Sequence, residues 1–325
     1  MSTAIVDIEV IKHAVALACR APSLHNSQPW RWVARAGVLH LYADPSRIGH
    51  YTDSTGKEVI LSCGAVLDHL RVAMAAAGWE AAIERYPDPA QREYLASIQF
   101  QRADPVTDTQ RALAEAMRRR RTDRLPFLTP ADWEAVLPAL RGAVGKGTVE
   151  LDVIDDDERP ALADASRLTQ QLRQHDPSYL AELLWWTGYT ADDEGIPPSA
   201  LASQEEAQRV DVARAFPRDG SGNRRPEIDR DHSKILVLST YDDSHPNVLR
   251  CGEMLSTVLL SCTAADLATC TLTHMIEVNA SRELVRRLID SLAEPQVLIR
   301  VGTAPHEPAP PPTPRRPPAE VLEVR

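Results

Sequence analysis

Two long apolar stretches of the chain repeat one pattern, and this repeat limits the possible folds more than any other feature. A Cys-Gly pair opens the pattern at residues 63–64 and again at 251–252, and the apolar positions that follow agree without a gap as far as Ala77 and Ala265. The alternative, two unrelated alanine-rich helices, explains shared composition but not a Cys-Gly pair in register. The repeat predicts two related halves within one polypeptide, which can replace a symmetric homodimer.

Helical and extended patterns alternate along the rest of the chain, which indicates an α/β or α+β fold built on a sheet. We expect helices over residues 8–19, 58–77, 108–119, 248–265 and 281–292, and one that starts within 129–132. We expect strands over residues 38–42, 94–100, 149–154, 235–240 and 297–301, and a strand-like segment after each long helix. The length of 325 residues suits roughly two domains, which we place at residues 1–104 and 105–325.

Two segments interrupt this alternation. Residues 187–231 are rich in charge, Gly and Pro, and such a long irregular stretch is usually a functional loop or disordered. We predict that they form a lid, although the preceding Trp185 and Trp186 are more typical of a packed core than of cofactor contacts. The tail at 305–318 is mostly proline and should be extended polyproline II, which is also typical of linkers and of SH3 ligands.

Composition excludes several classes of function. The net charge of -10 disfavours nucleic acid and anionic membranes as partners, and no apolar run approaches the roughly 20 residues that cross a bilayer. Residues 1–10 carry two acidic side chains and no basic n-region, so we expect no signal peptide and a cytoplasmic location. The five cysteines are widely spaced and fit buried free thiols, and no CxxC or His-rich spacing indicates a metal.

The first motif is the polar loop at residues 20–30, which follows the first predicted helix. Pro22 ends that helix, because the residue before a proline avoids the helical region. A hydroxyl, an imidazole and two amides then follow within a few residues and could address a polar ring or a polyol. A simple helix cap and turn would also use these residue types, and both interpretations stay open.

The second motif is a run of arginines at residues 118–121, followed by Thr122 and Arg124. Cations are favourable at the end of a helix, so a solvated helix terminus is one explanation. Guanidinium groups interrupted by a hydroxyl also suit a phosphate group, and on an acidic protein we favour this second interpretation. The tail adds two further arginines, Arg315 and Arg316.

These elements resemble the FMN-binding nitroreductase superfamily. The loop is similar to its PSxxNxQPW signature, and the arginine run is similar to its RRSxRxF element, with Thr122 in place of Ser and Phe127 one residue late. The resemblance implies that a loop after the second long helix presents backbone donors to the flavin, although His274 there could be a plain packed histidine. The residues that it assigns to FMN are Pro22, Ser23, Leu24, Asn26, Gln28, Arg120, Arg121, Thr122, Arg124, Thr271, Leu272, Thr273, His274, Arg315 and Arg316.

The distribution of the motifs resembles the Acg family, a branch of that superfamily with an internal duplication. The first half carries the polar loop and the second half carries the arginine run and the basic tail. The resemblance thus implies an α+β nitroreductase-like fold, one composite FMN site per chain with no metal, and a monomer acting as a pseudo-dimer or a weak homo-oligomer. Each half keeps only one part of the site.

For function, the resemblance implies two-electron transfer from NAD(P)H through the flavin to a nitro- or quinone-like acceptor. We find no strand–GxGxxG–helix element and assign no general acid or base from the sequence. The alternatives are an FMN-sequestering, storage or redox-sensing flavoprotein with little turnover, and an FMN-free scaffold whose arginines bind another phosphate.

Overall fold

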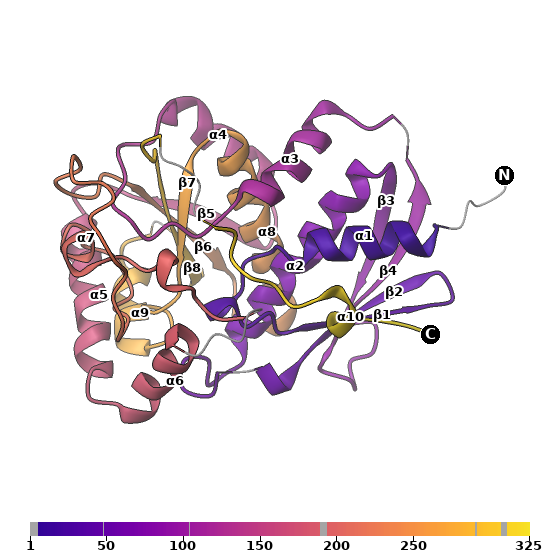
Figure 1. The fold of residues 1–325 in the computed structure, drawn as a ribbon, viewed down its shortest axis with the longest axis horizontal. Coiled ribbons are helices and arrows are strands. Elements are labelled where there is room, and N and C mark those ends of the chain that lie inside the picture. The colour runs from indigo at the N-terminus through magenta and orange to yellow at the C-terminus, as the bar shows by residue number, and fades with distance from the viewer. Residues whose placement is uncertain (1–5, 48, 104, 189–193, 290, 307–310) are drawn as a thin grey trace.

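The fold consists of two largely antiparallel sheets that lie on either side of a central pair of long helices (Figure 1). This computed structural model describes residues 6–47, 49–103, 105–188, 194–289, 291–306 and 311–325. Helix α2 (Lys57–Ala76) belongs to the first half of the chain and helix α8 (His245–Ala264) to the second, and the two pack against each other at the centre. The α+β class predicted from the alternation is confirmed.

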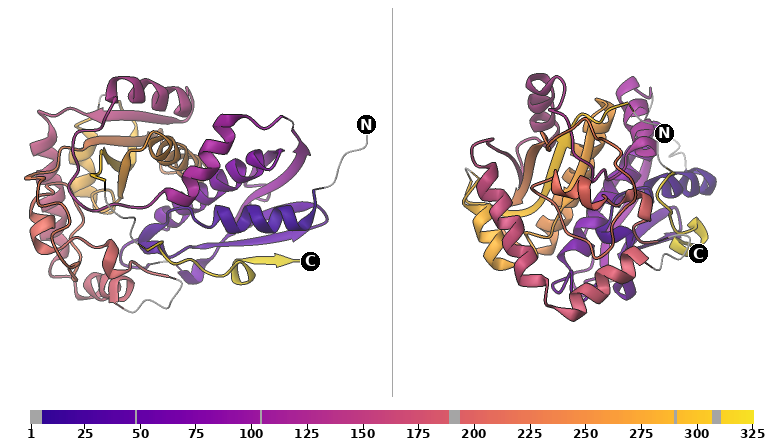
Figure 2. Two further views of the ribbon diagram at one scale, coloured as in Figure 1. Left: turned by 45° about the horizontal axis from the view of Figure 1, so that its top comes forward. Right: turned by 60° about the vertical axis from the view of Figure 1, so that its left-hand side comes forward.

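The first sheet has the order β3-β4-β2-β1-β9. Its strands are β1 (Trp30–Arg35), β2 (Val38–Ala43), β3 (Trp79–Arg85), β4 (Tyr94–Arg102) and β9 (Leu322–Val324). Strands β1 to β4 pair antiparallel, whereas β9 arrives from the end of the chain and pairs parallel with β1. Helix α1 (Ile8–Ala18) packs on α2 beside this sheet, and the tail reaches the sheet through helix α10 (Pro318–Val321), as both views of Figure 2 show.

The second sheet has the order β5-β6-β8-β7. Its strands are β5 (Val149–Ile154), β6 (Lys234–Thr240), β7 (Ala268–Leu272) and β8 (Glu294–Gly302), all paired antiparallel. The helices of this half are α3 (Asp108–Arg119), α4 (Trp133–Val144), α5 (Arg159–Arg173), α6 (Pro177–Gly188), α7 (Gln204–Gln208) and α9 (Asn279–Arg286). Three short 3₁₀ turns lie at Leu24–Asn26, Pro45–Arg47 and Pro198–Ala200.

The two sheets share one topology. If β1, β2, β3 and β4 are matched with β5, β6, β7 and β8, the strand orders coincide and every pairing is antiparallel in both. Each sheet also carries a register shift in the corresponding ladder, between Leu41 and Tyr42 in β2–β4 and between Leu238 and Ser239 in β6–β8. A bulge at the same place in both sheets is a specific feature, because bulges locally redirect a strand.

The long helices cross where the repeated Cys-Gly pairs lie. A Cβ atom built on Gly64 would lie 2.1 Å from the carbonyl oxygen of Leu249, and one built on Gly252 would lie 2.1 Å from that of Leu61. The two backbones therefore approach too closely for any side chain at either glycine. The contact is reciprocal, since each glycine meets the residue three positions before the other, as in a two-fold symmetric interface.

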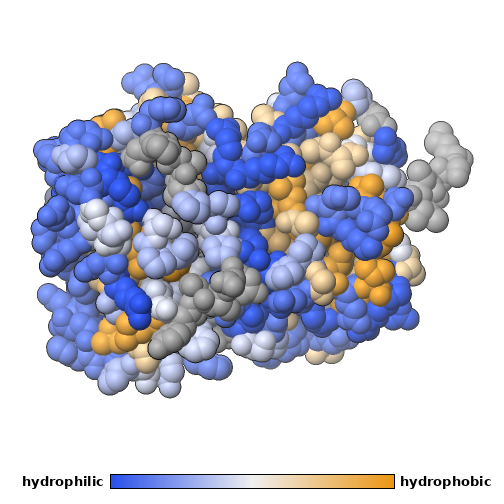
Figure 3. Space-filling model, in the orientation of Figure 1, coloured by the Kyte–Doolittle hydropathy of each residue, from blue (hydrophilic) through white to orange (hydrophobic). Residues whose placement is uncertain are grey.

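The centre of the molecule is apolar, while the face shown in Figure 3 is mostly hydrophilic over the second half. Helix α2 is the one helix in the described ranges long and apolar enough to cross a membrane, and 83% of its most apolar window is buried inside the molecule. A central packing helix satisfies the same test of length and composition. All five cysteines are free and buried, which confirms the predicted buried thiols.

Most predicted elements agree with the structure within a few residues, and the exceptions have physical reasons. The helix expected to start within 129–132 begins at Trp133, because the preceding Asp132 has a left-handed backbone, with φ of 50°, and Leu128 and Ala131 are bonded to Thr303. The helix expected over 281–292 lies at Asn279–Arg286. Of the tail, residues 307–310 lie outside the described residues, as do residues 189–193 of the predicted lid and residue 104 at the predicted domain boundary.

Candidate functional site

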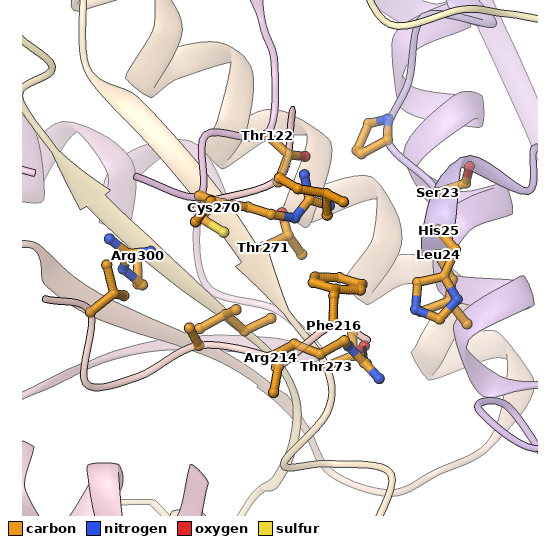
Figure 4. Close-up of a pocket in the computed structure, with 18 of the residues that line it drawn as sticks. Ser23, Leu24, His25, Thr122, Arg214, Phe216, Cys270, Thr271, Thr273 and Arg300 are labelled. Carbon is orange, nitrogen blue, oxygen red and sulfur yellow. Dashed lines mark hydrogen bonds between the residues drawn. The ribbon is translucent and has the colours of Figure 1, made fainter. Parts of the chain in front are cut away.

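A cavity with two compartments lies between the halves of the chain. The first compartment, of about 210 Å³, is bounded by the loop at residues 22–25, the start of α2, the end of β7 and the segment 201–219. In Figure 4, Thr122 and Cys270 lie across this space from Ser23 and His25. The second compartment, of about 560 Å³, is lined by the arginine run and the tail, and the two compartments share Thr122 and Arg124. Such volumes suit a small-molecule site.

The polar loop contributes to the site with its first residues only. Pro22, Ser23 and Leu24 line the first compartment. Asn26 instead donates hydrogen bonds to the carbonyl oxygens of Gly195 and Pro314, at 3.0 and 3.1 Å. The loop thus forms a wall of the cavity at one end and anchors other segments at the other.

Gln28 also points away from the cavity and holds the tail. Its side-chain oxygen accepts a hydrogen bond from the backbone N–H of Arg316 at 2.9 Å, and its side-chain amide donates to the carbonyl oxygen of Asn26 at 3.3 Å. Gln28 is fully buried and adopts a left-handed backbone conformation, with φ of 51°. This strain is compensated by the bonds that fix the tail against the loop.

Three buried or half-buried arginines meet in the second compartment without an acidic partner. Arg120 is 5% exposed and donates from its guanidinium group to the carbonyl oxygen of Arg20 at 3.2 Å, and its Nε has no partner. Arg315 donates to the carbonyl oxygens of Cys19 and Arg20, at 2.8 and 3.0 Å. In the described part of the chain, no carboxylate lies within ion-pair distance of any of the three, which we call the arginine cluster (Arg20, Arg120, Arg315).

The electrostatics of the arginine cluster are unfavourable in the protein alone. Burial, and then the charge of Arg20, lower the pKa of Arg120 to about 10. Burial, followed by the charges of Arg120 and Arg20, lowers the pKa of Arg315 to about 9. Both guanidinium groups remain protonated at neutral pH, so like charges are held together in a desolvated place. An anion bound between them would relieve this repulsion.

The neighbouring arginines of the run have other partners. Arg118 pairs with Glu115 at 3.0 Å and Arg119 pairs with Asp266 at 2.7 Å, and both are half exposed. Arg118 and Arg119 therefore fit the interpretation of a solvated helix terminus. Arg121 lies 3.7 Å from Asp123, and Arg124 lies over the ring of Phe216 with its guanidinium carbon 5.3 Å from the ring centre. Burial is the main cause that lowers the pKa of Arg124.

The structure also separates the two arginines of the tail. Arg315 lines the second compartment, whereas Arg316 lies between Asp44 and Glu320, at 3.9 and 3.8 Å. Arg316 also donates to the backbone oxygen of Gln28 at 3.3 Å. Of the two predicted phosphate ligands, Arg315 has the environment of an anion ligand and Arg316 has that of a structural anchor.

The end of β7 forms the wall opposite the polar loop. Thr271, Leu272 and Thr273 line the first compartment, and β7 is an edge strand of its sheet, so its outer edge presents backbone donors and acceptors. His274 is placed differently. It is 3% exposed, its Nε2 lies 2.9 Å from the hydroxyl oxygen of Ser166, and it lines a separate cavity of about 200 Å³ beside α5 and α6. These surroundings fit the interpretation of His274 as a packed histidine.

His25 lines the cavity and was not predicted as a site residue. His25 is 6% exposed, its ring points toward Phe216 in Figure 4, and neither ring nitrogen has a hydrogen-bond partner among the described residues. Its ring centre lies 6.3 Å from those of Trp186 and Phe216. Burial, and then the charges of Arg214 and Arg124, hold the pKa of His25 well below its ordinary value, so the ring is neutral. Its left-handed backbone, with φ of 51°, is not visible in the sequence.

The segment predicted as a lid encloses the first compartment over its described residues. Ten of its side chains line that compartment, among them Leu201, Arg214 and Phe216. Arg214 is anchored by an ion pair with Glu277 and a hydrogen bond to the hydroxyl of Tyr179 at 2.9 Å. Of the tryptophan pair, Trp186 is buried next to His25, and Trp185 is 55% exposed and therefore not in the core.

Together the fold and the cavity define an α+β protein in which a cluster of arginines adjoins an apolar compartment between the two halves of the chain. No protein-family model matches the chain. It is 56% identical over 326 residues to "Putative NAD(P)H nitroreductase acg" of Mycobacterium tuberculosis, an alignment that covers 100% of this chain and 98% of the relative. The chain belongs to the Acg family of nitroreductase-like proteins, and the predicted membership is confirmed.

Other proteins are similar to this chain. A second M. tuberculosis protein, described as uncharacterized, is 53% identical over 321 residues, which cover 97% of this chain and 93% of the relative. A third, with an NAD(P)H nitroreductase name, is 37% identical over 335 residues, 99% of this chain and 94% of its own length. Among solved structures, a nitroreductase with bound FMN from Desulfitobacterium hafniense has a TM-score of 0.40 at 10% identity, over 63% of this chain and 94% of its own.

Proposed function

We propose that this protein binds one FMN per chain and transfers two electrons from NAD(P)H through it to a nitro- or quinone-like acceptor. The names of the Acg relatives support turnover over sequestration. The observation that carries the proposal is the arginine cluster, a group of desolvated cations without acidic partners that adjoins an apolar compartment. FMN combines a phosphate with a flat ring system, and no metal is needed to hold either.

The arginine cluster fits the phosphate group. A phosphate monoester carries a charge of about -1.5 to -2 at pH 7 and three strong acceptor oxygens. The Nε of Arg120, which has no partner among the described residues, would supply a donor, and Thr122 adds a hydroxyl between the two compartments. Arg315 would act through its charge, because its N–H groups donate to backbone carbonyl oxygens. Arg121 and Arg124 line the same space, and the charge that they add favours an anion there.

The first compartment fits the ring system. Pro22, Ser23 and Leu24 would support one side of it, and Thr271, Leu272 and Thr273 would supply backbone groups on the other. When bound, FMN accepts a hydride from a nicotinamide and passes two electrons to the acceptor. Asn26, Gln28 and Arg316 would act indirectly, since they hold the loop, the tail and the segment at Gly195 together. His274 would pack behind residues 271–273 and would not contact the ring system.

We also propose that the described part of residues 187–231 acts as a lid. The support is the enclosed position of Phe216 and Arg214, and the bonds at the rim from Asn26 to Gly195 and between Arg47 and Glu194. Opening of the rim at residues 194–195 would break these two contacts, while the buried ion pairs of Arg225 with Asp123 and of Asp231 with Arg300 would hold the rest of the segment in place. Lids of this kind exclude water and control access to a site.

The shared topology supports an ancient duplication, with residues 1–104 and 105–325 as the two diverged halves. The reciprocal glycine contact supports a monomer that acts as a pseudo-dimer, because the interface that would join two subunits lies inside one chain. The five free, buried thiols support a cytoplasmic location.

The test is to purify the protein and measure its flavin. We expect a yellow protein that releases one FMN per chain on heating, and an FMN-loaded protein that NADPH reduces and a quinone reoxidises. A value near two would overturn the single composite site, and a colourless protein that FMN does not bind would overturn the cofactor. An FMN-loaded protein that NADPH leaves oxidised would instead favour the sequestration alternative.

A further inference from the structure

A pair of buried acids lies at the edge of the first compartment. Glu58, in the first turn of α2, lines the compartment and is 5% exposed, and Asp53, in the loop before α2, is 2% exposed. One oxygen of Asp53 accepts a hydrogen bond from the backbone N–H of Val59 at 2.9 Å. Its other oxygen is buried and meets no hydrogen-bond donor in the described part of the chain. A protonated carboxyl group on the neighbouring Glu58 would supply that donor.

The charges around this pair disfavour the ionised form of Glu58. Within the described residues, no Lys or Arg lies at ion-pair distance from Asp53 or Glu58. The nearest cation on α2, Lys57, bonds instead to Asp243 at 3.1 Å. From the turn after β7, Glu277 adds a further negative charge, and the guanidinium of Arg214 is already paired with Glu277. Burial, and then the hydrogen bond and charge of Asp53, hold the pKa of Glu58 well above its ordinary value of 4.5.

We propose that Glu58 is a catalytic residue of the proposed oxidoreductase, which holds a proton beside Asp53 and delivers it to the acceptor in the cavity. This inference rests on the proposed function. A quinone that accepts a hydride, with its two electrons, still needs one proton to become the hydroquinone. Glu58 forms the O–H bond on the acceptor by giving up its own proton, and both acids are then negative until a proton from water returns.

Fold stability alone does not explain the pair. Burying two acids together costs free energy that an apolar or amide side chain at either position would not cost. The corresponding position in α8, by the register of the Cys-Gly repeat, is Pro246, which carries no acid. Glu58 is therefore specific to the half of the repeat whose long helix begins at the cavity.

The first test needs neither FMN nor turnover. A proton that Glu58 holds in the folded protein is lost from the unfolded chain above pH 4.5, so folding is favoured at low pH and this contribution falls as the pH rises. From pH 5 to 7, we expect the unfolding equilibrium constant of the wild type to rise relative to that of Glu58→Gln, by up to tenfold per pH unit. If urea unfolding of the two proteins shows parallel pH dependence, Glu58 holds no proton and the proposal is wrong.

The second test separates the steps of turnover in the FMN-loaded protein. We expect Glu58→Gln to bind FMN and to be reduced by NADPH as the wild type is, but to reduce a quinone ~10²-fold more slowly. Glu58→Asp should recover part of the rate, and Glu115→Gln, the same change on the exposed face of α3, should leave it unchanged. An unchanged quinone rate in Glu58→Gln overturns the catalytic role, whereas a wild type that binds no FMN overturns the proposed function and leaves the pH test of the acid pair valid.

Discussion

The edges of β7 and β3 occupy corresponding places in the two sheets, and they differ in what stands beside them. Next to β7, Thr273 borders the open cavity. At the corresponding place on β3, Arg85 donates two hydrogen bonds of 2.6 Å to Glu253 of α8, and this ion pair fills the space. The two halves share the strand order, the register shift and the helix crossing, whereas the cavity lies beside only one of the two strands in the part of the chain that the structure describes.

The largest expected effect is on the reciprocal glycine contact, which involves both halves of the chain. Gly64→Ala and Gly252→Ala should each lower the free energy of unfolding by about 2–4 kcal/mol, because the added methyl group would overlap a carbonyl oxygen of the facing helix. The two losses should be similar, since the contact is reciprocal. Urea unfolding of the purified variants measures both.

The control for this comparison is Gly142→Ala in α4. A Cβ atom at Gly142 meets nothing within 4 Å, so the change should stabilise the helix by up to about 1 kcal/mol. A loss at only one of the two crossing glycines would contradict a symmetric packing contact and weaken the case for duplicated halves.

The next largest effect is on FMN affinity and concerns the arginine cluster. Arg120→Ala and Arg315→Ala should each weaken FMN binding about ten- to hundredfold, the loss of one charge-assisted bond of about 1.5–3 kcal/mol. Riboflavin, which lacks the phosphate, should bind weakly and respond little to either change. Titration of flavin fluorescence with the apoprotein measures both affinities.

Two controls sharpen this prediction. Arg111→Ala removes an exposed arginine of the same helix that is paired with Asp108, and it should leave FMN affinity unchanged. Arg120→Met should also stabilise the apoprotein, because it removes a desolvated charge that Arg20 repels. A variant that lost riboflavin and FMN to the same extent would show that Arg120 serves folding and not phosphate binding.

The smallest expected effect concerns the ion pair of Arg85 and Glu253 beside β3. Glu253→Gln should cost about 1–2 kcal/mol, because it leaves the partly buried Arg85 without its charged partner. Arg85→Leu combined with Glu253→Leu should recover most of that loss, and neither change should alter FMN affinity. Thermal unfolding with and without FMN measures this, and a second bound FMN in the double variant would show that the ion pair alone closes the twin site.

The sequence predicted most helices and strands well, because the patterns that indicate them lie within single segments of the chain. The strand at Val149–Ile154 and the helix at Asp108–Arg119 have the predicted bounds, since their side-chain periodicity and capping residues are read within one segment. Strand β9 was not predicted, because three residues at the end of the chain become a strand only through pairing with β1. Strand β1 was not predicted either, since the polar motif that it follows dominates that segment.

By itself, the sequence determined the family, the α+β class, the repeated Cys-Gly pattern of the long helices and the residues of the proposed phosphate site, because each is recorded in residue types at fixed spacing. Only the tertiary structure decided which of those residues share one cavity. Arg315 and Arg316 are neighbours in the chain, yet Arg315 lies among cations and Arg316 between two acids. His25 and Glu58 gained their importance from burial beside partners distant in sequence. A side chain's chemistry depends on the dielectric and charges around it, and these are properties of the folded chain.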